Sequence, residues 1–307
     1  MSRGARNDAL APWRGHARFD ASGLAPPVVV ACSGGPDSVA LLALACDADL
    51  DPVAVHVDHG LRAEHADDAA LVQEVAGQLG ARFVLAPVLV EPGGNLEARA
   101  RDARAEALRR ARVDTRSSVV LLGHTQDDQA ETVLLNLMRG AAGSGLAGMA
   151  YQRDEFVRPL LAMRRSDTHA ICAALHLPVA RDAMNDDPAF RRVAVRRDVL
   201  PLLTDVAGRD LVPVLARQAD IMREESAFLD ELAVAAWPDS TTSARALREL
   251  PPVLAQRAVR RWLGPPPPSR AEVARVLEVA HGSVRATELA GGRVVRRSGG
   301  QLLVEPR

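Results

Sequence analysis

Residues 28–39 have the sequence V-V-V-A-C-S-G-G-P-D-S-V. The run Val28–Cys32 is apolar and rich in β-branched valine, which is typical of a strand buried on both faces of a parallel sheet. Two glycines then allow a tight turn, and Pro36 suits the first position of a helix, where its missing N–H is not needed. This stretch therefore predicts a buried strand, a glycine turn and a helix that begins at the strand's end.

The same alternation of strand and helix continues along the first two thirds of the chain. Further strands are expected at residues 52–57, 82–90, 119–122 and 155–158. Helices are expected at residues 39–46, 64–79, 96–112, 126–138 and 166–175, with a glycine-rich loop at 140–148. Strands that alternate with helices at this spacing predict an α/β fold with a doubly wound parallel sheet.

The pattern changes near residue 205, after which we expect a smaller, mainly helical domain. Helical periodicity covers residues 211–237, 245–263 and, after four prolines, 271–280. Residues 285–304 alternate apolar and polar side chains around two Gly-Gly pairs, which is typical of short antiparallel strands. We therefore predict a partly disordered N-terminal extension at residues 1–27 and an α/β domain at residues 28–210. A helical domain with a short β-hairpin end is predicted at residues 211–307.

The composition excludes several kinds of chemistry. All 38 residues counted as Lys or Arg are arginine, so the chain has no lysine for a Walker A phosphate loop or a Schiff base. Cys32, Cys46 and Cys172 form no C-x-x-C pair, which argues against a disulfide framework and fits a reducing cytoplasm. Residues 1–27 lack the apolar region of a signal peptide, and no apolar run is long enough to span a membrane. A net charge of −1 leaves only a local patch for contact with nucleic acid.

The turn after the first strand is a candidate phosphate site. It lies at the carboxyl end of a parallel strand, where α/β folds bind ligands, and it opens a helix whose free N–H groups attract anions. The Asp37 carboxylate can hold Mg²⁺, which prefers oxygen ligands. An ordinary capped turn is the alternative, and the position favours phosphate. The predicted phosphate-binding residues are Ser33, Gly34, Gly35, Pro36, Asp37 and Ser38.

A second polar cluster, G-H-T-Q-D-D-Q-A-E-T, covers residues 123–132 after the fourth strand. Asp128 and Glu131 are three residues apart and therefore share a helix face, and His124 lies one turn before Asp128. Two carboxylates can hold a cationic amine or take up a proton. A His-Asp-Asp metal site and an acidic first turn that stabilises the helix dipole are the alternatives.

A third motif, V-D-H-G-L-R, ends the second strand at residues 57–62. Asp58, His59 and Arg62 are expected at the same edge of the sheet as the glycine turn, and we interpret them as the rim of a nucleotide site. The alternative is that Asp58 caps the next helix and His59 is an ordinary surface side chain.

These motifs resemble those of a known superfamily. The S-G-G-P-D-S turn at residues 33–38 is similar to the S-G-G-x-D-S signature of the PP-loop ATP pyrophosphatases. The motifs at 57–62 and 123–132 resemble those of the tRNA(Ile)-lysidine synthetases within it, as do residues 139–148, 158–160 and 181–203, in the same order. The chain departs from that subfamily's pattern with Ala105 for a tyrosine, Arg192 for an asparagine and Val195 for an isoleucine.

The resemblance implies an AMP-forming ligase that uses ATP and Mg²⁺. Such enzymes adenylate the C2 oxygen of the wobble cytidine in the isoleucine tRNA with a CAU anticodon, release pyrophosphate, and let the amine of free lysine displace AMP. It implies that residues 28–210 form the ATP-binding catalytic domain and that 211–307 contact tRNA, and it does not imply a protein partner. By position, Asp128 and Glu131 would bind lysine, His124 would lie by the adenylate, and Arg196 would face the reacting phosphate, while Asp37 would act in the PP-loop.

Two other hypotheses remain. Another PP-loop enzyme, a tRNA thiolase, is the first, although iron–sulfur thiolases need clustered cysteines that this sequence lacks. The second is a nucleotide- or tRNA-binding module without catalysis. Apart from Arg192, every expected polar site residue is present, which favours an enzyme.

Overall fold

The computed structural model describes residues 3–58, 65–88, 96–180, 191–238 and 241–306. Its contacts divide the chain into two compact units, Met1–Asp220 and Ile221–Arg307. The sequence placed a boundary between residues 210 and 211, whereas the division falls inside helix α10 (Val212–Ala236). The reason is that Val212, at the start of this helix, packs into a core of the first unit.

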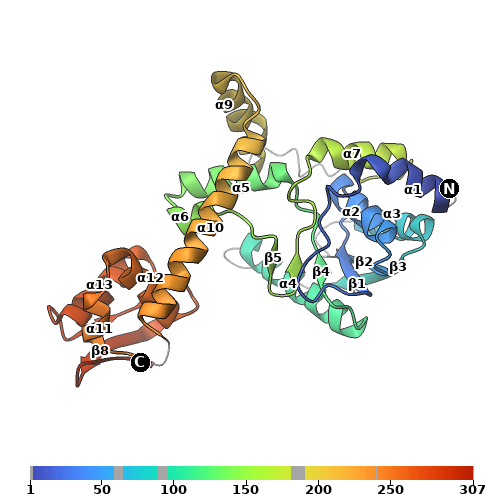
Figure 1. Ribbon diagram of the computed structural model, residues 1–307. Helices are drawn as coiled ribbons and strands as arrows, with labels where there is room; N and C mark the ends of the chain where they lie inside the picture. The colour runs from blue at the N-terminus through green and yellow to red at the C-terminus, as the bar shows by residue number, and fades with distance from the viewer. Residues whose placement is uncertain (1–2, 59–64, 89–95, 181–190, 239–240, 307) are drawn as a thin grey trace. The chain divides into compact units, whose positions relative to one another are not determined.

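The first unit is built on a six-stranded sheet in the order β3-β2-β1-β4-β6-β5. All neighbouring strands are parallel except β5, which pairs with β6 in the antiparallel direction. The sheet is drawn with its helices in Figure 1. The parallel sheet predicted from the alternation is therefore confirmed, with these strands: β1 (Val28–Ala31), β2 (Pro52–Asp58), β3 (Arg82–Pro87), β4 (Val120–Leu121), β5 (Gln152–Arg153) and β6 (Phe156–Val157).

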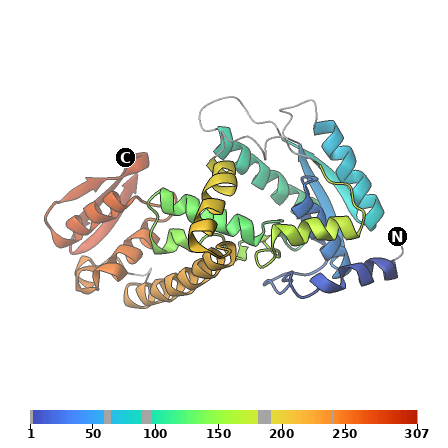
Figure 2. The ribbon, with the colours of Figure 1, turned by 90° about the horizontal axis from the view of Figure 1, so that it is seen from above.

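Alternate residues of β1 supply the two faces of the sheet. Val28 and Val30 join the larger core, which α2 (Pro36–Asp47), α3 (His65–Leu79) and α7 (Arg165–Ala174) complete. Val29 and Ala31 join a second core on the opposite face, against α4 (Leu96–Asp114). Burial on both faces explains why this strand is a continuous apolar run. The helices on the two sides of the sheet can be followed in Figure 2.

A small third core places the helices that follow the sheet. Ala130 and Leu134 of α5 (Gln126–Met138) pack with Val195 and Leu200. These last two residues begin the π-helical turn η3 (Val195–Val199) and α9 (Leu200–Ala207), just after α8 (Arg191–Ala194). The packing holds the arginine-rich segment 191–197 against α5. The glycine-rich loop expected at 140–148 contains one short helix, α6 (Gly143–Leu146).

The N-terminal extension contains helical structure. Residues 3–13 form α1 (Arg3–Leu10) and the 3₁₀ turn η1 (Ala11–Trp13). Leu10 is fully buried and packs in the larger core, so this segment contributes apolar burial to the α/β unit. Tyr151 fastens the following stretch, because its hydroxyl donates to the Arg18 carbonyl and accepts from the Asp20 N–H.

The second unit combines helices with a three-stranded antiparallel sheet, in the order β7-β8-β9. One helix was expected over residues 245–263, but the structure has two, because Leu250 is extended before Pro251 and Pro252 starts a new helix. Trp237 is fully buried in the core. The elements are α11 (Ala244–Glu249), α12 (Pro252–Leu263), α13 (Arg270–His281), β7 (Ala286–Glu288), η4 (Ala290–Gly292), β8 (Arg293–Ser298) and β9 (Gln301–Pro306). In the part of the chain that the structure describes, no helix is both long and apolar enough to cross a bilayer.

Candidate active site

The strand order creates a switch point beside β1. The chain runs from β1 to β2 and β3 on one side and then places β4 on the other side of β1. Ligands of such sheets bind at the carboxyl ends of the strands that flank this point. A Cβ on Gly123, just after β4, would lie 3.0 Å from the carbonyl carbon and oxygen of Asp37. The absent side chain therefore lets the turn after β4 touch the turn after β1.

The turn between β1 and α2 is tightly folded. The Ser38 hydroxyl donates to the Gly35 carbonyl at 2.9 Å and accepts from the Ser33 N–H at 3.2 Å. Gly34 has φ +89°, a conformation that L side chains rarely adopt, and a Cβ there would lie 3.3 Å from Cβ of Ala180. The first turn of α2 leaves N–H groups without intrahelical acceptors. Both features suit a site for phosphate.

Asp37 is the second residue of α2, and its carboxylate contacts residues of α7. Its Oδ1 accepts a hydrogen bond from the hydroxyl of Thr168, a fully buried residue of α7. Its Oδ2 lies 3.7 Å from Nε of Arg165. Burial nevertheless raises the pKa of Asp37, because these contacts compensate only partly for the lost hydration. A partly buried carboxylate that is costly to ionise is typical of a functional position.

Asp128 has a structural contact on one oxygen and an ionic contact on the other. Its Oδ2 accepts from the N–H of Thr125 at 2.8 Å, which completes a capping box at the start of α5. This oxygen therefore helps to cap the first turn of α5. Its Oδ1 lies 3.0 Å from Nη2 of Arg165. Burial favours the neutral form, but the charges of Arg165, His124 and Arg192 prevail and hold the pKa of Asp128 below its usual range.

Glu131, one turn further along α5, is fully buried and surrounded by cations. Three guanidinium groups contact its carboxylate, with nitrogen–oxygen distances of 3.1 Å from Arg165, 2.8 Å from Arg192 and 2.7 Å from Arg196. Arg196 was expected to face a phosphate, and here it contacts Glu131 through both Nε and Nη2. Arg192, the departure from the subfamily pattern, also contacts this carboxylate.

His124 lies in the turn between β4 and α5, in a partly buried position. Burial is the main cause that lowers its pKa to about 4; the charges of Arg158, Arg192 and Arg104 act in the same direction, and Asp128 opposes them. The imidazole is therefore neutral at neutral pH. Its Nδ1 is buried and has no hydrogen-bond partner among the described residues. A neutral imidazole with an unpaired ring nitrogen can accept a hydrogen bond from a bound group or donate one to it.

The structure brings together most of the predicted site. Asp37, Asp128, Glu131 and Arg196 are joined through Arg165 or Glu131. Asp58 ends β2 at the same edge of the sheet, since β2 is the parallel neighbour of β1. The remaining predicted residues, His59 and Arg62, lie outside the described residues, as does segment 181–190.

Sequence reasoning missed Arg165 and Thr168. Both lie on the first turns of α7, and both contact the carboxylate of Asp37. The two consecutive arginines at 164 and 165, shortly after the R-P-L motif, were the available signal. An arginine pair on a helix is ordinarily solvated, so the sequence did not distinguish Arg165 from a surface residue.

The alternative of a His-Asp-Asp metal site is not supported by the geometry. Asp127 points to a different group of donors, since its Oδ2 accepts from the Arg165 N–H at 2.8 Å and lies 3.2 Å from Nε of Arg164. Across the described ranges, no group of three or more His, Cys, Asp or Glu side chains is placed to hold a metal ion.

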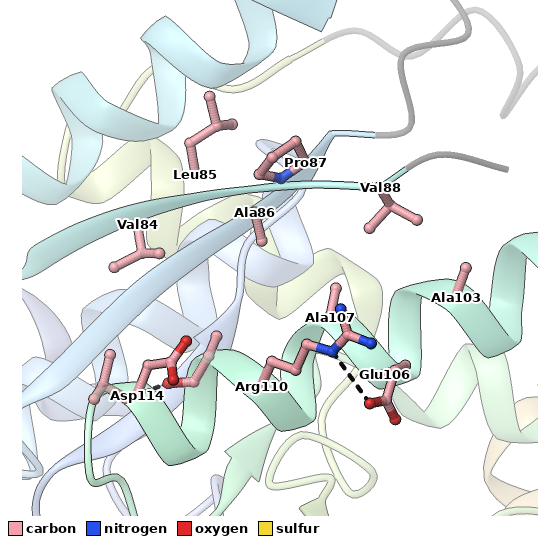
Figure 3. Close-up of a pocket in the computed structure, with 12 residues that line it drawn as sticks. Val84, Leu85, Ala86, Pro87, Val88, Ala103, Glu106, Ala107, Arg110 and Asp114 are labelled. Carbon is pink, nitrogen blue, oxygen red and sulfur yellow. Dashed lines mark hydrogen bonds and ion pairs between the residues drawn. The ribbon is translucent and has the colours of Figure 1, made fainter.

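A cavity of about 490 Å³ lies elsewhere, between β3 and α4 (Figure 3). Apolar side chains such as Val84, Ala86 and Ala107 line it, and none of the predicted site residues does. Two of its charged side chains, Glu106 and Arg110, pair with each other at 3.3 Å. The convergent polar groups are at the switch point instead, so we assign the candidate active site there.

Comparisons with known proteins agree with this geometry. Residues 18–203 match the family model described as the PP-loop domain, and residues 243–303 match that of the TilS substrate binding domain. The tRNA(Ile)-lysidine synthase of Rhodococcus erythropolis is 45% identical over 242 residues, which are 77% of this chain and 73% of the relative. That of Salinispora tropica is 40% identical over 314 residues, 91% of each chain.

A solved structure supports the fold alone. The U34-tRNA thiolase NcsA from Methanococcus maripaludis, with its [4Fe-4S] cluster, aligns with a TM-score of 0.55 and 16% identity. The alignment covers 73% of this chain and 80% of the thiolase. Because the PP-loop model matches more than half of the chain and the sequence relatives agree over most of its length, the chain belongs to the tRNA(Ile)-lysidine synthase family.

Proposed function

We propose that the cluster of Asp37, Asp128, Glu131 and their arginines is the site at which this chain performs the reaction of its family. In that reaction ATP activates the C2 oxygen of the wobble cytidine in the CAU-anticodon isoleucine tRNA, and the amine of free lysine then displaces AMP. One observation carries the assignment. Arg165 contacts Asp37 in the phosphate turn and also Asp128 and Glu131 on α5. The proposed phosphate site and the proposed lysine site are therefore adjacent.

ATP would bind with its phosphates on the Ser33–Ser38 turn. The positive φ of Gly34 and the open first turn of α2 support this, because both let backbone N–H groups approach an anion closely. Asp37 suits Mg²⁺, which is ordinarily held by one or two carboxylates together with substrate phosphates. A bound Mg²⁺ would supply charge neutralisation at the departing pyrophosphate.

The lysine amine would bind at Oδ1 of Asp128 and at the carboxylate of Glu131. A cationic amine is recognised by carboxylates, and the lowered pKa of Asp128 keeps that carboxylate charged at neutral pH. Attack on C2 needs the neutral amine, so the proton must leave the amine before the bond forms. Carboxylate oxygens at the site are acceptors for it.

His124 and Arg196 would act on the activated nucleotide. His124 is neutral and has a free Nδ1, so it can hydrogen-bond to the adenylate without adding charge. Arg196 is a fixed guanidinium, held by Glu131, and such a cation stabilises negative charge on a reacting phosphoryl group. Adenylation turns the cytidine oxygen into a good leaving group, so one difficult substitution becomes two easier ones.

The tRNA would contact both units. The match of residues 243–303 to the TilS substrate binding domain supports a role for the second unit. The target cytidine must leave its stack to enter the site, which anticodon loops permit. Arginines would carry the phosphate contacts, so affinity should fall steeply as salt rises. A cytoplasmic location, where tRNA, ATP and free lysine occur together, belongs to the same proposal.

The test is incorporation of radiolabelled lysine into the CAU-anticodon isoleucine tRNA, with Mg²⁺ and ATP and with pyrophosphate release measured in parallel. Asp37→Asn should abolish both signals, whereas Asp128→Asn should lose lysine incorporation while tRNA binding survives. Glu106→Gln, a change on α4 in the cavity away from the site, is the matched control. Pyrophosphate release without lysine incorporation would indicate another adenylating enzyme, and no turnover with any tRNA would indicate a binding module.

A further inference from the structure

The three arginines on Glu131 differ in exposure. The side chain of Glu131 itself is 0% exposed, and those of Arg165 and Arg196 are 20% and 28% exposed. Arg192 is 41% exposed, yet its Nε lies only 2.8 Å from Oε2 of Glu131. Arg192 is therefore the cation that covers this carboxylate on the solvent side.

Arg192 contacts both carboxylates that would bind the lysine amine. Its Nη2 is 3.9 Å from Oδ1 of Asp128, and it also donates to the Asp128 carbonyl at 3.2 Å and the Thr132 hydroxyl at 3.0 Å. All of these acceptors are on α5. Arg192 therefore occupies a half-exposed position from which a cation reaches both carboxylates.

The carboxylates and the arginines that contact one another here are equal in number. Asp37, Asp128 and Glu131 supply three carboxylates, and the three arginines 165, 192 and 196 supply three cations. An added ammonium would leave one cation in excess in a partly desolvated site. Release of Arg192 restores the balance, and Glu131 would still have two guanidinium partners, so no buried charge would be left unpaired.

We propose that Arg192 competes with the lysine amine for the carboxylates of Asp128 and Glu131. Arg192 must leave this position before the amine can bind, and it thereby determines the KM for lysine. This inference rests on the proposed function, because it takes Asp128 and Glu131 as the lysine site. Arg192 would leave by rotation of its half-exposed side chain into solvent. Arg165 and Arg196 would remain in position during this exchange.

The test is steady-state kinetics of lysine incorporation at saturating ATP and tRNA. Arg192→Gln should lower the KM for lysine by about 2- to 5-fold, the range that one half-exposed ion pair supports, with kcat within about twofold of the wild type. Arg192→Lys keeps a competing cation and should leave the KM near the wild-type value. Arg191→Gln, at the neighbouring exposed position of α8, is the matched control and should change neither constant.

A second readout separates competition from a structural role. Methylguanidinium carries the same cationic group as the arginine side chain, so it should inhibit Arg192→Gln more strongly than the wild type, by a similar factor. Arg192→Met keeps much of the aliphatic stem and should behave like Arg192→Gln, which covers the case in which the Gln variant folds poorly. A raised KM for lysine or a large loss of kcat in both neutral variants would overturn the inference. If the wild type shows no lysine-dependent turnover, the proposed function fails instead.

Discussion

The guanidinium of Arg165, on α7, donates to the buried carboxylate of Glu131, on α5, at 3.1 Å. The same group lies 3.0 Å from Asp128 and 3.7 Å from Asp37. One cation therefore links the carboxylate at the phosphate turn to the two carboxylates on the helix after β4. Any ligand that extends from the phosphate turn to Asp128 and Glu131 would contact the Arg165 side chain.

Arg165→Gln should lower kcat for lysine incorporation by about 100-fold, the usual effect of removing one preorganised charge from an active site. Glu131 keeps Arg192 and Arg196, so the variant should remain folded. Arg165→Lys should recover only part of the activity, because an ammonium cannot contact three carboxylates in a fixed geometry.

Arg110→Gln is the control for this variant, since Arg110 is a 75% exposed arginine of α4 that pairs with Glu106. It should retain wild-type kcat. If Arg165→Gln retains wild-type kcat as well, Arg165 has no positioning role.

Asp37→Asn should abolish turnover without loss of stability. Burial raises the pKa of Asp37, so the folded protein binds this proton more tightly than the unfolded chain does. The stabilisation from the protonated carboxyl group is complete when the pH is below 3.8, the ordinary pKa of Asp in the unfolded chain. It is lost as the pH rises through the raised pKa of Asp37 in the folded protein. At neutral pH the ionised carboxylate therefore weakens the fold, and the neutral amide should leave Tm equal or higher. A clear drop in Tm at pH 7 would contradict this.

His124→Gln should reduce the acid sensitivity of the fold. The pKa of His124 is lowered to about 4 by burial, from an ordinary value of 6.5, so the unfolded chain binds the proton more readily. Stability from this group is complete above pH 6.5 and is lost progressively as pH falls toward 4, by at most about 3 kcal/mol. Urea unfolding at pH 7.5 and pH 5 should show a smaller difference for the variant. His16→Gln, at an exposed position, should behave like the wild type.

Glu272→Gln should destabilise the second unit at neutral pH. The Glu272 carboxylate accepts from the Ser269 N–H at 2.8 Å, the Ser269 hydroxyl at 2.7 Å and the Ala290 N–H at 2.7 Å. These bonds, the Ser269 hydroxyl first, lower the pKa of Glu272 to about 2. The stabilisation from the ionised Glu272 carboxylate is therefore present when the pH is above 4.5, the ordinary pKa of Glu. It is lost as the pH falls through about 2.

Thermal unfolding of the full chain checks this, with Glu278→Gln at an exposed position of the same helix as the control. The gap in Tm between wild type and Glu272→Gln should be widest near pH 7 and should narrow below pH 4.5. A gap that does not change with pH would mean that the carboxylate charge is not the cause.

Much of the first unit follows from local sequence. The valine run at 28–30 predicted a strand covered on both faces, and the structure places apolar cores on both sides of it. The helix predicted at 126–138 has those bounds in the structure. The helix predicted at 245–263 was wrong, because apolar periodicity was followed across Pro251 and Pro252, which end one helix and begin another. Periodicity reports which face is buried, whereas the backbone break comes from proline geometry.

Local sequence was enough to predict the alternating α/β fold, the glycine turn after β1 and the pair Asp128 and Glu131 on one helix face, because strand burial, turn chemistry and helical spacing are all local. The cations on Glu131 were decided by tertiary structure. Arg165, Arg192 and Arg196 are 34, 61 and 65 residues away in the chain and reach it because the fold places α8, η3 and the start of α7 beside α5. An arginine pairs with whichever carboxylate the packing brings close to it. The spacing of two residues in the sequence does not give the distance between their charged groups in the fold.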